Sequence, residues 1–144
     1  MTKTIQRLRI LSLGDPMVGK SSLIKRYCEE NFSPEYHPTI GIDYGVKDFS
    51  IDEFKADFFD TAGDDVYLEI RNEFYENINA FIIVFDLTSK KSFENVNKWM
   101  SELKRYNQTS HIKALGFLFG NKLDLGRAIS KTVIEQFASE SNLS

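Results

Sequence analysis

The feature that most constrains this chain is residues 14–21, which read GDPMVGKS. They fit the pattern G-x-x-x-x-G-K-[ST], in which backbone N–H groups converge on phosphate at the start of a helix. An apolar run precedes the loop at residues 8–13, and a helical pattern follows it at residues 20–30. This strand–loop–helix order predicts a phosphate-binding loop. The alternative is a glycine-rich turn that only leads into a helix.

Two side chains of this loop carry its chemistry. Lys20 is expected to reach the β- and γ-phosphates of a nucleotide, and the Ser21 hydroxyl is expected to ligate Mg²⁺. The predicted phosphate contacts are the loop residues and the one that follows them, namely Gly14, Asp15, Pro16, Met17, Val18, Gly19, Lys20, Ser21 and Ser22.

Composition narrows the class of protein. The chain has 144 residues, which predicts one domain over residues 1–144. Its formal net charge of −3 gives no support for nucleic-acid binding by bulk electrostatics. There is no signal peptide, no apolar run of membrane-spanning length and no C-terminal cysteine for a prenyl group, so we expect no direct membrane anchor on this chain. The single Cys28 fits a cytoplasmic location and is expected to be a half-buried packing thiol.

Apolar runs alternate with helical patterns along the chain. Strands are expected at residues 8–13, 44–51, 54–59, 80–85 and 114–119, the last two buried. Helices are expected at residues 20–30, around 93–103 with Ser89 or Ser92 as cap, and around 133–138 after Ser130. This order predicts an α/β fold with a mostly parallel sheet, one antiparallel hairpin strand and flanking helices. Ligands of such folds bind beyond the carboxyl ends of the strands.

Residues 60–63, DTAG, follow the strand at 54–59. An aspartate at this place, Asp60, is expected to anchor Mg²⁺ through a water molecule. Gly63 is expected to bring a backbone N–H close to a γ-phosphate, because it has no side chain to interfere. The alternative is an ordinary turn, in which the D-x-x-G pattern is common.

Residues 121–124, NKLD, follow the last predicted strand. The carboxylate of Asp124 is able to accept two hydrogen bonds from the N1–H and 2-amino group of guanine, and adenine lacks that pair of donors. A polar loop cap is the alternative for this stretch.

Taken together, these three motifs resemble those of a Ras-superfamily small GTPase, whose fold is a P-loop G domain. Residues 39–44, TIGIDY, are similar to the Rab branch. Residues 40–46 with residues 71–75, RNEFY, resemble the RJL group of Rab-like GTPases, some of which are fused to a J domain. The resemblance implies GTP or GDP bound with Mg²⁺, a role in signalling or vesicle trafficking, and protein effectors and an exchange factor that bind the switch regions. The family continues beyond this point with a strand, an S-A-K-like loop and a helix, so we expect a fold without them and with an uncovered sheet edge.

The resemblance also implies roles for single residues. Phe32 matches the aromatic residue that packs on guanine, and Tyr36 matches the switch I tyrosine that closes over the phosphates. Thr39 matches the threonine that completes the Mg²⁺ shell and contacts the γ-phosphate, a contact that hydrolysis releases. Asn121 is implied to tie the base-binding loop to the P-loop, and Lys122 to lie along the nucleotide.

Two positions depart from the family. Lys20 and Thr39 are implied catalytic residues, but Asp64 stands where a glutamine usually orients the attacking water. A carboxylate there repels the negative charge of the phosphoryl group, which predicts slow hydrolysis; the alternatives are that Asp64 points to solvent or acts as a general base. Pro16 replaces a common glycine. Its ring either obstructs an incoming arginine finger, or the replacement is tolerated variation.

A set of apolar side chains matches the Rab effector surface: Ile40, Tyr44, Phe59 and Phe74. They form an exposed patch or are part of the core. Arg71 and Glu73 nearby are expected to form an ion pair or a solvated helix face. The whole pattern predicts a GTP-dependent switch; the alternatives are a non-hydrolysing GTP-bound scaffold that recruits partners and an incomplete domain that needs one.

Overall fold

The computed structural model describes residues 4–49, 53–110 and 113–144. Five strands form one sheet in the order β2-β3-β1-β4-β5. The strands are β1 (Gln6–Leu13), β2 (Ile42–Phe49), β3 (Phe54–Thr61), β4 (Ala80–Asp86) and β5 (Leu115–Asn121). Only β2 and β3 among them pair in antiparallel fashion, and the other three pairings are parallel. The predicted α/β fold is therefore confirmed, while residues 50–52 of the predicted hairpin lie outside the described part.

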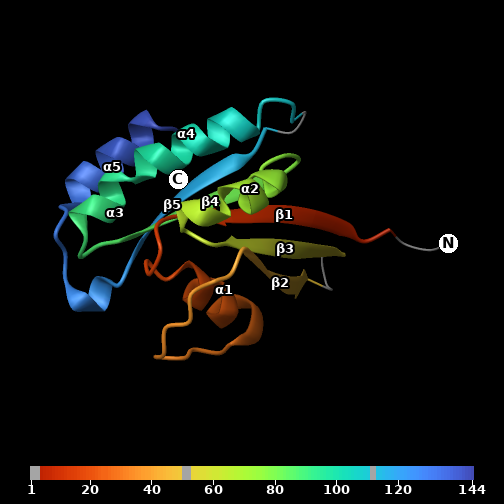
Figure 1. The fold of residues 1–144 in the computed structure, drawn as a ribbon, viewed down its shortest axis with the longest axis horizontal. Coiled ribbons are helices and arrows are strands. Elements are labelled where there is room, and N and C mark those ends of the chain that lie inside the picture. Colours follow the sequence, from red (N-terminus) through yellow and green to blue (C-terminus); the bar gives the residue numbers. More distant parts are fainter. Residues whose placement is uncertain (1–3, 50–52, 111–112) are drawn as a thin grey trace.

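Helices cover both faces of this sheet. They are α1 (Lys20–Glu29), α2 (Leu68–Arg71), α3 (Lys90–Glu94), α4 (Val96–Tyr106) and α5 (Lys131–Glu140), with short 3₁₀ helices η1 (Asp65–Tyr67), η2 (Asn72–Phe74) and η3 (Leu123–Leu125). In Figure 1, α1 lies on one side of the sheet, and α3, α4 and α5 lie on the other. The phosphate-binding loop emerges between these layers, at the carboxyl end of β1.

The helix expected around residues 93–103 is divided into two. The break between α3 and α4 falls at Asn95, and Phe93 belongs to the first of the two helices. Ser89 caps α3, because its hydroxyl accepts the backbone N–H of Ser92 at 3.2 Å. Ser130 caps α5 in the same way, by accepting from Val133 at 3.3 Å.

Two apolar cores stabilise the sheet. The larger core lies beneath α4 and includes Leu11, Phe85 and Trp99. The smaller core joins α1 to β3 through Ile24, Ala56 and Phe58, and the last two lie on one face of β3. Cys28 is half-buried against this second core, as expected.

A strand is present where one was expected at residues 114–119, but the expectation that it is buried is wrong. β5 lies at the edge of the sheet, where Leu115 is 65% exposed and Phe119 is 42% exposed. An apolar run predicts a strand, but whether a helix covers it depends on distant segments. On the outer side of β5, the backbone of Ser144 bonds to Gly116 and Leu118 over 3.0 and 2.9 Å.

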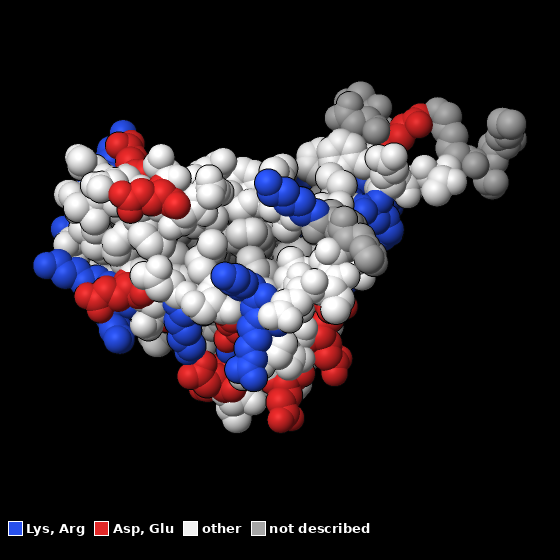
Figure 2. All heavy atoms as spheres, turned by 90° about the horizontal axis from the view of Figure 1, so that it is seen from above, with Lys and Arg blue, Asp and Glu red and all other residues white. Residues whose placement is uncertain are grey.

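The surface carries both signs of charge. On the face over α4 and α5, basic and acidic side chains are interspersed rather than gathered by sign (Figure 2). Within the described residues, every helix is too short or too polar to cross a bilayer.

Candidate functional site

The loop after β1 wraps around the side chain of Lys20. Lys20 is buried at the start of α1, and its ammonium donates to the carbonyls of Gly14 at 2.7 Å and Asp15 at 2.8 Å. Burial lowers the pKa of Lys20 to about 8, because the interior disfavours the charged form. An anion at this loop offsets that cost, since it brings an opposite charge to the ammonium. The predicted phosphate-binding lysine is thus held where the loop closes on itself.

Gly19 stands where two loops meet. Its φ is 100°, and a Cβ there would lie 2.2 Å from the side-chain nitrogen of Asn121. That same nitrogen donates to the carbonyl of Val18 at 2.9 Å. Asn121 therefore ties the loop after β5 to the phosphate-binding loop, and only glycine leaves room for it.

The loop after β5 makes a second tie through Lys122. Its ammonium donates to the carbonyl of Met17 at 2.6 Å and pairs with Asp86 at 2.9 Å. Asp124 follows in η3 with an exposed side chain. The predicted base-binding stretch thus lies against the phosphate loop, with Asp124 turned to solvent.

Three oxygen-bearing side chains converge beside Lys20. The hydroxyl of Ser21 lies 2.8 Å from that of Thr39, and it also donates to a carboxylate oxygen of Asp60. The other oxygen of Asp60 accepts from Ser12 at 3.2 Å. Burial raises the pKa of Asp60. All of these ligand candidates are hard oxygen donors, the kind that Mg²⁺ prefers, so the three residues fit the metal that the sequence predicts.

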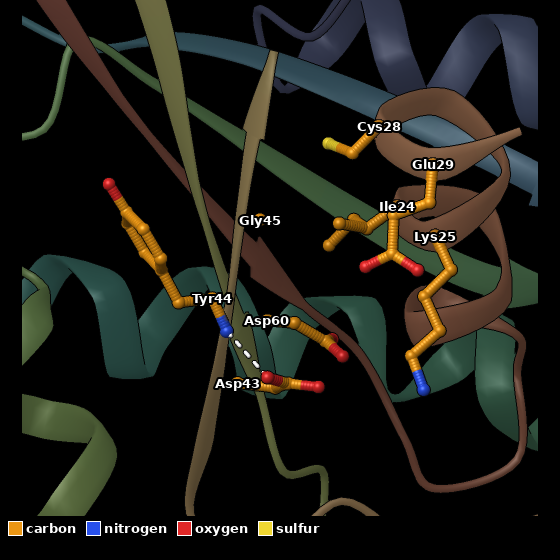
Figure 3. A pocket seen from close by; sticks show the side chains of 8 residues that line it. All are labelled: Ile24, Lys25, Cys28, Glu29, Asp43, Tyr44, Gly45 and Asp60. Carbon is orange, nitrogen blue, oxygen red and sulfur yellow. Dashed lines mark hydrogen bonds between the residues drawn. The ribbon is translucent and has the colours of Figure 1, made fainter.

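A small pocket adjoins this cluster between α1 and β2. In Figure 3 the carboxylates of Asp43 and Asp60 point toward α1, while the ring of Tyr44 points to the other side of the sheet. The charge of Asp43 adds to the effects that raise the pKa of Asp60. A divalent cation near Asp60 relieves this repulsion between two neighbouring carboxylates.

The D-x-x-G loop lies directly against the phosphate-binding loop. A Cβ on Gly63 would lie 2.5 Å from the backbone nitrogen of Pro16 and 2.6 Å from the carbonyl oxygen of Gly14. The exposed Asp64 caps η1, because its carboxylate accepts the N–H of Val66 at 3.0 Å. Gly63 thus lies against the phosphate-binding loop, while its contact with a γ-phosphate stays a prediction. Asp64 has a local structural partner.

The residues of the switch I stretch at 31–39 are mostly in solvent. Phe32 and Tyr36 are exposed, so in this conformation neither ring covers the loop. Thr39, at the end of the stretch, is half-buried because it meets Ser21. The structure brings Thr39 to the site and leaves the two aromatic residues outside it.

The aromatic residues matched to an effector surface contact one another. Phe59 lies 5.6 Å from Tyr44 and 5.3 Å from Phe74 between ring centres. Tyr44 is 50% exposed and Ile40 is 79% exposed, whereas Phe59 and Phe74 are half-buried against the core. The cluster therefore has an exposed rim and a packed base, which combines both alternatives that the sequence leaves open.

Arg71 lies in a place that its sequence neighbours do not predict. An ion pair with Glu73 or a solvated helix face was expected, but the Arg71 side chain has no exposed surface. Its guanidinium forms a two-pronged ion pair with Glu102 at 2.6 and 3.0 Å. It also donates to the carbonyls of Ala62 at 3.0 Å and Asp64 at 2.7 Å. No local pattern signals this arrangement, because Glu102 lies on a different helix.

The fold and the site define a class. A mostly parallel sheet that carries a lysine-bearing glycine loop at the carboxyl end of β1 and an aspartate at the end of β3 is a P-loop nucleotide-binding domain. The family model described as Ras family matches residues 9–144, so the chain belongs to the Ras family of small GTPases. GTP binding and the P-loop follow from this membership.

Several relatives have similar sequences. DnaJ homolog subfamily C member 27-B of Xenopus laevis is 46% identical over 101 residues, which cover 69% of this chain and 37% of the relative. DnaJ homolog subfamily C member 27 of Danio rerio is 41% identical over 123 residues, which cover 83% of this chain and 45% of the relative. The Gallus gallus protein of that name is 45% identical over 101 residues, which cover 69% of this chain and 37% of the relative. The chain spans less than half the length of these relatives, and their names agree with the resemblance to Rab-like GTPases that include J-domain fusions.

Proposed function

We propose that this chain is a guanine-nucleotide switch with Rab-like features that binds GTP or GDP together with Mg²⁺. The observation that carries the proposal is the convergence of Ser21, Thr39 and Asp60 beside Lys20. Ser21, Thr39 and Asp60 would hold the metal, which would supply positive charge to offset the negative charge of the phosphates. Thr39 belongs to the exposed switch I stretch, so its contact with the metal site links nucleotide state to the shape of that stretch.

Guanine selection is assigned to Asp124, and the tie between its loop and the phosphate loop supports this assignment. The bonds from Asn121 to Val18 and from Lys122 to Met17 fix the distance between a base and its phosphates. Effectors and an exchange factor are proposed to bind the exposed rim formed by Ile40 and Tyr44 over Phe59 and Phe74. The cytoplasmic location stays a prediction from the single cysteine.

Slow hydrolysis is part of the proposal, because Asp64 lacks the amide of the usual glutamine. A second function is favoured by the same residue, since its carboxylate is already engaged as the cap of η1. With that side chain occupied and no amide to orient water, the chain would act as a GTP-bound scaffold that recruits partners.

The bound nucleotide separates these functions. The protein is purified without added nucleotide, denatured, and the released nucleotide is identified by ion-exchange chromatography. Mostly GDP supports the hydrolysing switch, and GTP retained after long incubation supports the scaffold. Calorimetric titration of stripped, folded protein with GDP and with a non-hydrolysable GTP analogue completes the test, because no heat with either overturns the proposal.

The metal assignment has its own test. Ser21→Ala removes the hydroxyl between Thr39 and Asp60, so affinity for the analogue should become independent of Mg²⁺. Ser101→Ala, on the exposed side of α4, is the matched control and should keep the dependence on Mg²⁺. An unchanged dependence in Ser21→Ala argues against this metal site.

A further inference from the structure

The buried guanidinium of Arg71 bonds to the backbone on both sides of Gly63. One of its terminal nitrogens donates to the carbonyls of Ala62 at 3.0 Å and Asp64 at 2.7 Å. The carbonyl of Ala62 and the N–H of Gly63 belong to one planar trans peptide group and point in opposite directions. A bond that fixes the carbonyl therefore fixes the direction of the Gly63 N–H.

Arg71 is itself held by α4. Glu102 accepts both prongs of the guanidinium, at 2.6 and 3.0 Å, and its carboxylate also accepts from the hydroxyl of Tyr75. The ring of Trp99 lies beneath the guanidinium, with its centre 4.8 Å from the Arg71 Cζ atom. Two-pronged arginine–carboxylate pairs are geometrically specific, so the guanidinium has little freedom to rotate.

The peptide that Arg71 orients lies at the phosphate-binding loop. Gly63 is so close to the backbone of Gly14 and Pro16 that no Cβ fits between them. In the proposed function the last phosphate of a triphosphate lies beside this loop, and the Gly63 N–H is the donor assigned to it. A diphosphate has no group there.

We propose that Arg71 is a positioning residue for the terminal phosphate. It holds the peptide between Ala62 and Gly63 in the orientation that presents the Gly63 N–H to the γ-phosphate, and Glu102 keeps it in place. This inference rests on the proposed nucleotide-binding function and adds a residue to it. Arg71 acts only through the backbone and touches no nucleotide.

The consequence is a selective loss of triphosphate binding. Arg71→Met should lower the affinity for a non-hydrolysable GTP analogue with Mg²⁺ about tenfold, which is the effect of one hydrogen bond to a charged group. Affinity for GDP should change by less than about threefold, since GDP makes no use of that N–H. Isothermal titration calorimetry on stripped protein measures both values.

Glu102→Gln is the second variant, because Arg71→Met leaves a buried carboxylate unpaired and is at risk of unfolding. The amide has the shape of the acid but loses one acceptor, so the loss of selectivity should be smaller and of the same sign. Leu103→Ala, a buried core position on the same helix, is the matched control. It should lower the melting temperature without changing the ratio of the two affinities.

The outcomes separate this inference from the proposed function. If the folded wild type binds neither nucleotide, the proposed function fails. If the wild type binds both, and Arg71→Met or Glu102→Gln lowers both affinities equally or neither, Arg71 is only a structural residue and this inference alone is overturned.

Discussion

The indole N–H of Trp99 donates to a carboxylate oxygen of Asp15 over 2.8 Å, which joins α4 to the phosphate-binding loop. The other oxygen of Asp15 accepts from the side-chain amide of Asn95 at 2.7 Å. Both side-chain oxygens of Asp15 therefore face α4. What Asp15 offers to the loop interior is its backbone, whose carbonyl accepts from Lys20.

Trp99→Phe should loosen the loop without emptying the core. The ring volume is largely kept, but Asp15 loses one of its two donors in a half-buried place, so the unfolding free energy should fall by about 1–3 kcal/mol. Affinity for GDP and for a GTP analogue should fall together, because the loop contacts phosphates that both share. Urea denaturation and calorimetry measure the two effects. Lys104→Ala, at an exposed position of the same helix, should change neither. A stable Trp99→Phe with unaltered affinities contradicts the role given to this bond.

Two glycines offer a matched pair of substitutions. Gly19 and Gly126 have nearly the same φ, 100° and 101°, but a Cβ on Gly19 would meet Asn121 at 2.2 Å, whereas no atom lies within 4 Å of one on Gly126. Alanine at either position should cost roughly 1–3 kcal/mol of backbone strain. Gly19→Ala should in addition displace Asn121 and abolish nucleotide binding, which Gly126→Ala should keep. Equal nucleotide affinities in the two variants are the result that this account does not permit.

Much of this site follows from the sequence because its signals are local. The phosphate loop, the strand before it and the helix after it all lie within residues 8–30, and the D-x-x-G and NKLD stretches each lie at the end of a strand. Asn121 was expected to reach the P-loop only through resemblance to a family, and the bond to Val18 now gives the contact itself.

What the sequence does not reveal depends on partners far along the chain. Arg71 finds its carboxylate 31 residues away, and Asp15 finds the indole 84 residues away. Periodicity says which face of a helix is apolar, but it does not say which distant charge that face will bury. The apolar run of β5 predicted a buried strand for the same reason, since the helix that would cover a strand is not encoded in the strand. Only the family resemblance led to the expectation of an uncovered sheet edge.

Acid should weaken the contact between Asp57 and Arg7. The hydrogen bond from Arg7, with another from Tyr44, holds the pKa of Asp57 below its ordinary value. The folded state therefore binds the Asp57 proton less tightly than the unfolded chain does. The stability that this carboxylate contributes is present above about pH 4, the ordinary pKa of aspartate, and is lost as the pH falls through the lower folded value.

Asp57→Asn tests that sign. The variant should be less stable than the wild type at pH 7, and the difference should shrink below about pH 4. Denaturant unfolding of both proteins at pH 7, 5, 4 and 3 measures this difference in stability. Asp48→Asn, at a half-exposed pair with Lys55, is the control and should show a much smaller effect at every pH. A difference that grows toward low pH contradicts the account.

Asp64→Gln should speed single-turnover GTP hydrolysis. Two unit charges ~6 Å apart at an effective dielectric of ~20 repel by roughly 3 kcal/mol, so full relief of the repulsion amounts to about two orders of magnitude in rate. Asp64→Asn removes the charge without restoring the length of glutamine and should give a smaller gain. Glu69→Gln, at an exposed position of α2, is the control for charge in general. A rate in Asp64→Gln no faster than that of the wild type refutes the inhibitory role, and a slower one favours Asp64 as a general base.

Asp124→Asn should change the base preference from guanine to xanthine. Xanthine carries an oxygen where guanine has its 2-amino group, so an amide donor suits it and a carboxylate does not. Competition between GDP and XDP for the stripped protein gives the preference. Because Asp124 is exposed, the melting curve of Asp124→Asn should match that of the wild type. This comparison is the control for folding. If GDP remains preferred to the same degree, another residue recognises the base.

The hydroxyl of Tyr44 donates to Asp57 at 2.8 Å and accepts from Arg7 at 2.9 Å, while its ring stays half in solvent. An outward-facing aromatic ring usually samples several rotamers, and it loses conformational entropy when a partner binds and fixes one of them. Here the rotamer is pinned from behind by the polar end of the same side chain. Any protein that docks on this ring therefore meets a preorganised surface. The entropy of fixing the ring is lost when the chain folds and not when the partner binds.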